Sequence, residues 1–196
     1  MSRFRFASSC RRWLLIAAAL GTGIAQADPW GLPELMQSLS SVQARELNYV
    51  ETKHLAALDT PLVSEGRLAS SEDGALQMEV YTPKWAQYII TDDTFTILTE
   101  GKPTREIELA DQPQLAAFAA AFRAVRQGDL PTLQQFYELV LQGDDASWQL
   151  SLKPRDAEMA SRIAEIRLAG SGGLIASITT QQTDGDRSEM RLTPVN

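Results

Sequence analysis

Residues 76–80 read LQMEV, a strict alternation of apolar and polar side chains. Successive side chains of a β-strand point to opposite faces of the sheet, so the alternation predicts a strand with one buried face. Turn-forming residues precede the stretch at residues 72–74 and follow it at Pro83. The stretch therefore predicts one strand between two turns, which is the repeating unit of an antiparallel meander.

Segments on both sides of this strand carry related patterns. Leu47, Tyr49 and Glu51 are two positions apart, so they would share one face of an earlier strand. Proline, glycine and aspartate separate the other extended pieces. These pieces are centred on residues 65–70, 88–91, 95–99, 105–109, 148–152, 166–168, 174–180 and 189–192. The Asp184-Gly185 pair between the last two pieces predicts a β-hairpin.

Three other segments have helical periodicity, with apolar residues three or four positions apart. The first has its apolar residues at Leu32, Leu35, Met36, Leu39 and Val42. The second ends at Gly128, and its stripe consists of Leu115, Phe118, Ala119, Phe122 and Val125. The third is expected to run from Asp129 to Gly143, with apolar residues at Leu133, Phe136, Tyr137 and Val140. The sequence therefore predicts an α+β fold that is mainly antiparallel β.

The first 27 residues have a different character from the rest of the chain. Four arginines precede an apolar run at residues 13–24, and a small-x-small motif follows at residues 25–27. This order is typical of a cleaved secretory signal peptide, and the run is too short to span a membrane. We expect residues 28–196 to form a single exported, soluble domain. It would contain no thiol, because Cys10 lies in the removed segment.

The charge of the chain limits its partners. The net charge is −7. Removal of residues 1–27, which hold four arginines and no acidic residue, would bring it to −11. A nucleic-acid-binding surface needs clustered basic residues, so we expect no nucleic acid partner.

No group of residues predicts catalysis or metal binding. His54 is the only histidine and lies three positions after Glu51, but in a strand that offset places the two side chains on opposite faces. The acidic residues at 144–145 and 184–186 lack the spacing of a calcium loop and are better interpreted as turns. Residues 170–173, GSGG, also predict a tight turn. We expect no enzyme activity, no metal site and no cofactor.

The order of the elements and several local motifs resemble a known family. The motifs are YVETK at 49–53, PLVSEG at 61–66, GDL at 128–130, WQLSLKP at 148–154 and DGDRSEM at 184–190. In this order they are similar to the outer-membrane lipoprotein carrier superfamily (LolA-like), and more closely to its divergent LolA-related branch. The resemblance covers residues 30–194. It implies an incomplete, half-open β-barrel with an α-helical lid over a hydrophobic cavity that receives acyl chains.

The resemblance also implies a function. We expect a monomeric periplasmic carrier that takes a lipoprotein or another lipidated cargo, such as a glycolipid, from an inner-membrane exporter toward an outer-membrane acceptor. The alternative is a non-transporting periplasmic module that senses lipids or binds proteins. A carrier must also release its cargo, and lid side chains that fill the empty cavity would compete with the acyl chain.

The expected lipid-binding residues form two groups. On the lid we place Leu35, Leu39, Leu115, Phe118 and Phe122. Among the inward side chains of the sheet we place Tyr49, Met78, Val80, Ile89, Phe95, Leu150 and Ile178. The second group depends on strand register, because a shift of one residue moves a side chain to the other face.

Overall fold

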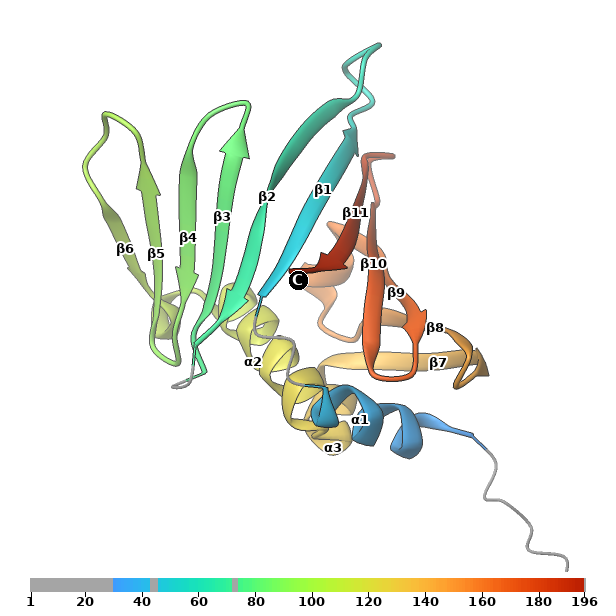
Figure 1. The fold of residues 1–196 in the computed structure, drawn as a ribbon. Coiled ribbons are helices and arrows are strands. Elements are labelled where there is room, and N and C mark those ends of the chain that lie inside the picture. The colour runs from blue at the N-terminus through green and yellow to red at the C-terminus, as the bar shows by residue number, and fades with distance from the viewer. Residues whose placement is uncertain (1–29, 43–45, 72–73, 196) are drawn as a thin grey trace, which may run out of the picture.

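The computed structural model describes residues 30–42, 46–71 and 74–195, and it is dominated by one curved antiparallel sheet (Figure 1). The expected signal peptide at residues 1–27 lies outside the described residues. Three helices lie together beside the lower ends of the strands in Figure 1. In the described part of the chain, no helix is both long enough and apolar enough to cross a membrane.

Eleven strands of the described chain form this sheet, in the order β6-β5-β4-β3-β2-β1-β11-β10-β9-β8-β7. The first six are β1 (Glu46–His54), β2 (Leu62–Ser70), β3 (Leu76–Thr82), β4 (Ala86–Ile90), β5 (Thr94–Thr99) and β6 (Arg105–Glu108). The others are β7 (Tyr137–Asp144), β8 (Ser147–Pro154), β9 (Ile163–Ser171), β10 (Leu174–Gln182) and β11 (Arg187–Pro194). Consecutive strands pair from β1 to β6 and from β7 to β11, and β1 also pairs with β11, which joins the two meanders. The end strands β6 and β7 do not pair, so the sheet is a half-open barrel, as predicted.

The helices fall before, between and within the two meanders. They are α1 (Leu32–Ser41), the 3-10 turn η1 (Leu109–Asp111), α2 (Pro113–Gln127), α3 (Leu130–Phe136) and α4 (Ala157–Ala160). Gly128 ends α2 with φ of 72°, a left-handed conformation that favours glycine. The Asp129 side chain then accepts a hydrogen bond of 3.1 Å from the backbone N–H of Thr132 and caps α3. The predicted boundary between these two helices is therefore confirmed.

The expectation that the third helix runs to Gly143 is wrong. The helix ends at Phe136, and the next residues form the edge strand β7. Tyr137, Leu139 and Leu141 alternate with more exposed residues along β7, which is the period of a strand. β7 pairs along its whole length with β8, and Gly143, with φ of 90°, leads into the turn between them. Pairing with β8, the next strand in the sequence, decided the structure here, where local apolar spacing fitted both periods.

The main core lies between the helices and the β7 to β9 end of the sheet. Leu35, Leu133 and Leu150 are fully buried there. Other members are Met36, Leu39, Ala121, Ala124, Tyr137, Trp148, Leu152, Met159 and Leu168. The indole N–H of Trp148 donates a hydrogen bond of 2.8 Å to the carbonyl of Gly172, which holds the β9–β10 turn against β8. This core fixes α1, α2 and α3 on one face of the sheet.

Candidate functional site

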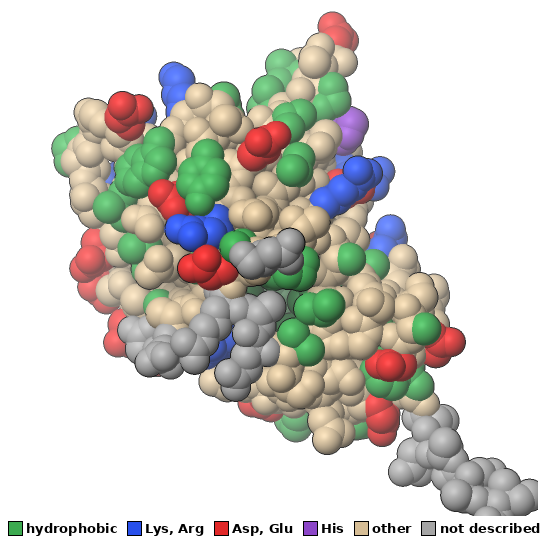
Figure 2. All heavy atoms as spheres, viewed as in Figure 1, with side chains coloured by type: hydrophobic (Ala, Val, Ile, Leu, Met, Phe, Trp, Pro, Cys, Tyr) green, Lys and Arg blue, Asp and Glu red, His purple; other side chains and the backbone are tan. Residues whose placement is uncertain are grey.

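An apolar cavity of about 280 Å³ lies between the helices and the middle of the sheet. Strands β1, β2, β3, β10 and β11 form its floor, and α1 and α2 form its other side. Its apolar lining includes Leu39, Val42, Leu47, Leu68, Leu76, Phe122, Val125, Leu174, Ile175, Ile178 and Leu192. Figure 2 shows hydrophobic side chains gathered around a hollow near the middle of this face. Such an apolar space, partly open to solvent, suits an aliphatic ligand.

Strand register explains why the floor is apolar. Directly opposite residues of paired strands share a face of the sheet. Leu47 lies opposite both Leu68 and Pro194, and Leu68 lies opposite Met78. Across the other meander, Ile178 lies opposite Leu168. One continuous apolar face therefore passes from β3 through β1 to β9, beneath the helices.

Three of the expected lipid-binding residues line the cavity: Leu39, Phe122 and Ile178. Leu35 and Leu150 lie in the fully buried core instead. On α2, Leu115 is half-buried and lies outside the cavity lining. Phe118, also on α2, is 44% exposed. The expected lid residues therefore lie on α1 and α2, but they are divided between the core, the cavity and the solvent-exposed surface.

The expected sheet residues divide in a similar way. Tyr49, Met78, Val80 and Phe95 lie on the same face as Ile178 but outside the cavity lining. Ile89 does not share that face, because it lies opposite Gln77 and Thr96, whereas its neighbour Ile90 lies opposite Leu76 and Phe95. Its placement among the inward side chains is a register error of one residue.

Arg126 is the cavity residue of greatest chemical interest, and sequence reasoning missed it. It is the only charged side chain among the described lining residues, and it lies in the last turn of α2, four positions after Phe122. One guanidinium nitrogen, Nη1, donates a hydrogen bond of 3.2 Å to the hydroxyl of Ser70 on β2. Its Nε is buried and has no hydrogen-bond partner among the residues that the structure describes. The i, i+4 spacing from Phe122 was the available signal, because these positions lie on one face of a helix.

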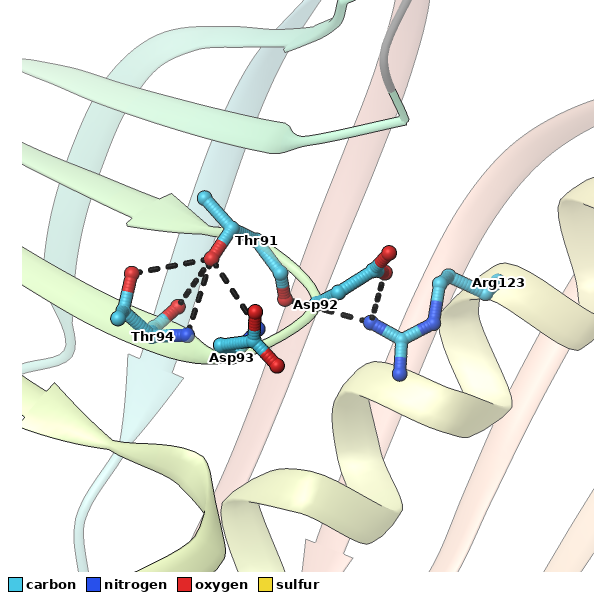
Figure 3. Close-up of polar contacts among 5 residues, drawn as sticks. All are labelled: Thr91, Asp92, Asp93, Thr94 and Arg123. Atoms are coloured by element: carbon cyan, nitrogen blue, oxygen red, sulfur yellow. Dashed lines mark hydrogen bonds and ion pairs between the residues drawn. The ribbon is translucent and has the colours of Figure 1, made fainter.

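A second arginine connects α2 to the β4–β5 turn, in the half of the sheet that lies away from the main core. Arg123 forms an ion pair of 3.1 Å with Asp92 and donates a hydrogen bond of 3.3 Å to the carbonyl of Thr91 (Figure 3). The Thr91 hydroxyl accepts a hydrogen bond of 2.9 Å from the N–H of Thr94, which makes this β4–β5 turn compact. Arg123 thus joins α2 to the β4–β5 turn, and Arg126 joins it to β2 near the cavity.

Tyr49 and Glu51 form a buried polar pair on the inner face of β1. Tyr49 is 2% exposed, and burial, followed by the nearby charge of Glu51, raises the pKa of its hydroxyl. Glu51 forms an ion pair of 3.2 Å with Lys53 and accepts a hydrogen bond of 3.4 Å from Ser64. His54 lies on the other face of β1, at its exposed end, as the three-residue offset predicts. Glu51 and His54 are not brought together.

The acidic segments near 144 and 184 form turns. The Asp144 carboxylate accepts hydrogen bonds of 3.0 and 3.1 Å from the N–H groups of Ala146 and Ser147. Asp184 similarly accepts a hydrogen bond of 3.0 Å from the N–H of Asp186. Within the described ranges, no three His, Cys, Asp or Glu residues gather closely enough to hold a metal ion.

Comparisons with known proteins agree with this architecture. The family model described as outer membrane lipoprotein carrier protein LolA-like matches residues 25–194. No curated protein matches the chain.

The solved structures that are similar to this chain share little sequence with it. A LolA superfamily protein from Nitrosomonas europaea is 8% identical with a TM-score of 0.42, over 81% of this chain and 90% of that one. LprF from Mycobacterium bovis is 12% identical with a TM-score of 0.38, over 84% and 94%. A chain of the Pseudomonas aeruginosa MucA/MucB complex is 15% identical with a TM-score of 0.44, over 84% of this chain and 56% of that one. This chain therefore spans little more than half of that last protein. From the family match over nearly its whole length, the chain belongs to the LolA-like family of outer membrane lipoprotein carrier proteins.

Proposed function

We propose that this protein is a periplasmic carrier that binds an acyl chain of a lipidated cargo and moves it from the inner membrane toward the outer membrane. The observation that carries the proposal is the apolar cavity between α2 and the sheet, in a member of the LolA-like family. Leu39, Phe122 and Ile178, which line that cavity, would contact the chain. The cargo would be a lipoprotein or another acylated molecule such as a glycolipid.

The hydrophobic effect explains why such a cargo needs a carrier. Each buried methylene group contributes about 0.8 kcal/mol, so a sixteen-carbon chain gains roughly 12 kcal/mol, before costs, when it leaves water. Unaided passage through an aqueous compartment is therefore very slow. An apolar cavity lowers this barrier because it replaces the membrane interior during transit.

Release requires that the empty protein also be stable. Side chains of α1 and α2 already line the cavity, so a long chain would displace part of them. The helices then compete with the ligand for the same surface and reduce its net affinity. Arg123 would resist this movement of α2 through its contacts with the β4–β5 turn.

The proposal is tested by what the protein carries and by blocking the cavity. The protein would be expressed from its full chain, purified from the periplasm without detergent, and analysed by native mass spectrometry and by mass spectrometry of its organic extract. We expect a stoichiometric acylated molecule. Ile178→Trp should reduce its occupancy, whereas Thr179→Trp, a neighbour on the other face of β10, should not. A folded wild-type protein that is empty and takes up no fluorescent fatty acid would contradict the proposal.

A second candidate is a protein-interaction module that transports nothing. It is favoured by large apolar side chains on the outer face of the sheet, where Val50 is 43% exposed and Val63 is 51% exposed. Tyr81, at a bulge of β3, is 46% exposed. Exposed apolar groups on neighbouring strands are typical of protein interfaces. In this case, Val63→Asp should abolish binding of a partner, and Ile178→Trp should have no effect.

A further inference from the structure

The cavity combines an apolar wall with one cation. Among the described residues of the lining, Arg126 is the only charged one, and the other polar side chains are the serines Ser70 and Ser171. An aliphatic chain alone would have no use for a guanidinium at this position. A charge beside an apolar wall is also unfavourable unless a partner offsets its loss of water.

Within the described part of the chain, one hydrogen bond uses only one of the donors of Arg126. A guanidinium carries five N–H donors in a planar fork. Among the described residues, its hydrogen bond goes to the neutral hydroxyl of Ser70, at 3.2 Å. Its buried Nε has no hydrogen-bond partner in the ranges that the structure describes. An arginine in this state is suited to an acceptor that brings two oxygens and a negative charge.

The size of the cavity limits the apolar part of such a ligand. Its volume of about 280 Å³ lies at the lower end of the roughly 300–1,000 Å³ found for small-molecule sites. This space suits one aliphatic chain rather than several side by side. Strands of the sheet and α2 line this space, and Arg126 is one of the lining residues, so a chain bound there would lie close to its guanidinium.

We infer that the cavity recognises a single-chain amphiphile with an anionic headgroup, a carboxylate or a phosphate, which Arg126 binds through paired hydrogen bonds. The inference rests on the proposed function, because it names the class of ligand for the same cavity. The aliphatic chain supplies affinity, and Arg126 supplies selectivity for the anion.

Three dodecyl probes test the inference: dodecanoate, dodecyl phosphate and dodecanol. Their binding to the detergent-free, delipidated protein would be measured by isothermal titration calorimetry, for the wild type and for Arg126→Gln. We expect the wild type to bind one or both anions at least about tenfold more tightly than dodecanol. Arg126→Gln should lose this preference and bind dodecanol as the wild type does. Comparison of the two anions identifies the headgroup as carboxylate or phosphate.

Matched variants separate a specific effect from general charge or misfolding. Arg162→Gln removes an exposed arginine far along the chain, in contact with Glu158, and should keep the preference. Arg126→Lys should keep only part of it, because lysine lacks the planar fork. Unchanged dodecanol binding shows that Arg126→Gln remains folded.

The outcomes distinguish the inference from the proposed function. Equal wild-type affinity for all three probes would overturn the inference and leave the carrier proposal intact. So would an equal loss of affinity for anions and dodecanol in Arg126→Gln. If no probe binds to the folded wild type, the inference and the proposed acyl-chain cavity are both overturned.

Discussion

Arg123 on α2 and Asp92 on the β4–β5 turn form an ion pair of 3.1 Å, and Arg123 also donates a hydrogen bond to the carbonyl of Thr91 (Figure 3). The main core packs α2 against the β7 to β9 end of the sheet. The Arg123 contacts lie in the other meander, so the helix is attached to both halves of the half-open barrel. When ligand entry moves α2, the polar contacts of Arg123 with the β4–β5 turn would break more easily than the apolar contacts of α2 with the main core.

Removal of this attachment should speed ligand exchange without unfolding the protein. Asp92 is 78% exposed, so Arg123→Gln should lower the free energy of unfolding by no more than about 1 kcal/mol. If this loss destabilises only the closed state and not the transition state for opening, the release rate of a fluorescent fatty acid should rise about fivefold. Stopped-flow release and urea unfolding measure the two effects. Arg162→Gln is the control, and an unchanged release rate in Arg123→Gln would show that the attachment does not gate the cavity.

Two apolar residues of the helical pair should differ sharply in their effect on stability. Leu133 on α3 is fully buried, whereas Phe118 on α2 is 44% exposed. Leu133→Ala leaves a void in the core and should lower the free energy of unfolding by about 2–5 kcal/mol. Phe118→Ala removes a larger side chain but should cost less than about 1 kcal/mol. Urea denaturation compares the two, and a similar loss in both would mean that Phe118 is buried in solution.

Much of the fold could be predicted because local patterns agreed with the final pairing. The alternation at residues 76–80 forms β3, and Gly128 and Asp129 separate α2 from α3 as their turn and capping chemistry predicts. The pattern at Tyr137 was ambiguous, and only the pairing with β8 made it a strand. Apolar spacing alone fits a helix and a strand equally well here, and pairing with the adjacent strand β8 decides between them.

The candidate site was less predictable than the fold. Apolar spacing identified Phe122 as an inward residue of α2, but it could not separate cavity from core, as Leu35 shows by its complete burial. Ile89 was misplaced because strand faces depend on register, and two apolar neighbours fit either choice. Arg126 was missed because a charged residue in a helix is usually solvated, and its position in the cavity depends on how α2 crosses the sheet.

Acid should weaken the start of α3. Hydrogen bonds from the side chain and the backbone N–H of Thr132 lower the pKa of Asp129 below its ordinary value of 3.8. The charged cap therefore contributes stability above the unfolded pKa, and this contribution is lost as pH falls through the lower folded pKa. Asp129→Asn keeps an acceptor but does not titrate, so stability should fall less steeply from about pH 5 to pH 2. Thermal unfolding across this range tests it, with Asp129→Ala less stable at neutral pH as well. Parallel profiles for wild type and Asp129→Asn would contradict the assignment.

The close approach of β3 to Gly66 should make this position intolerant of any side chain. Gly66 lies opposite Tyr49 on β1 and beside a bulge in the β2–β3 pairing. A Cβ atom there would lie 1.8 Å from the backbone carbonyl oxygen of Glu79 and 2.8 Å from the Tyr49 hydroxyl. Because the nearest atom belongs to the backbone, Gly66→Ala must displace β3 and should cost at least about 2 kcal/mol of unfolding free energy. Gly101→Ala, with φ of 71° and no atom within 4 Å, should cost only the roughly 1 kcal/mol of a left-handed backbone. If urea unfolding gave equal losses for the two, the approach of β3 to Gly66 would be looser in solution than in this structure.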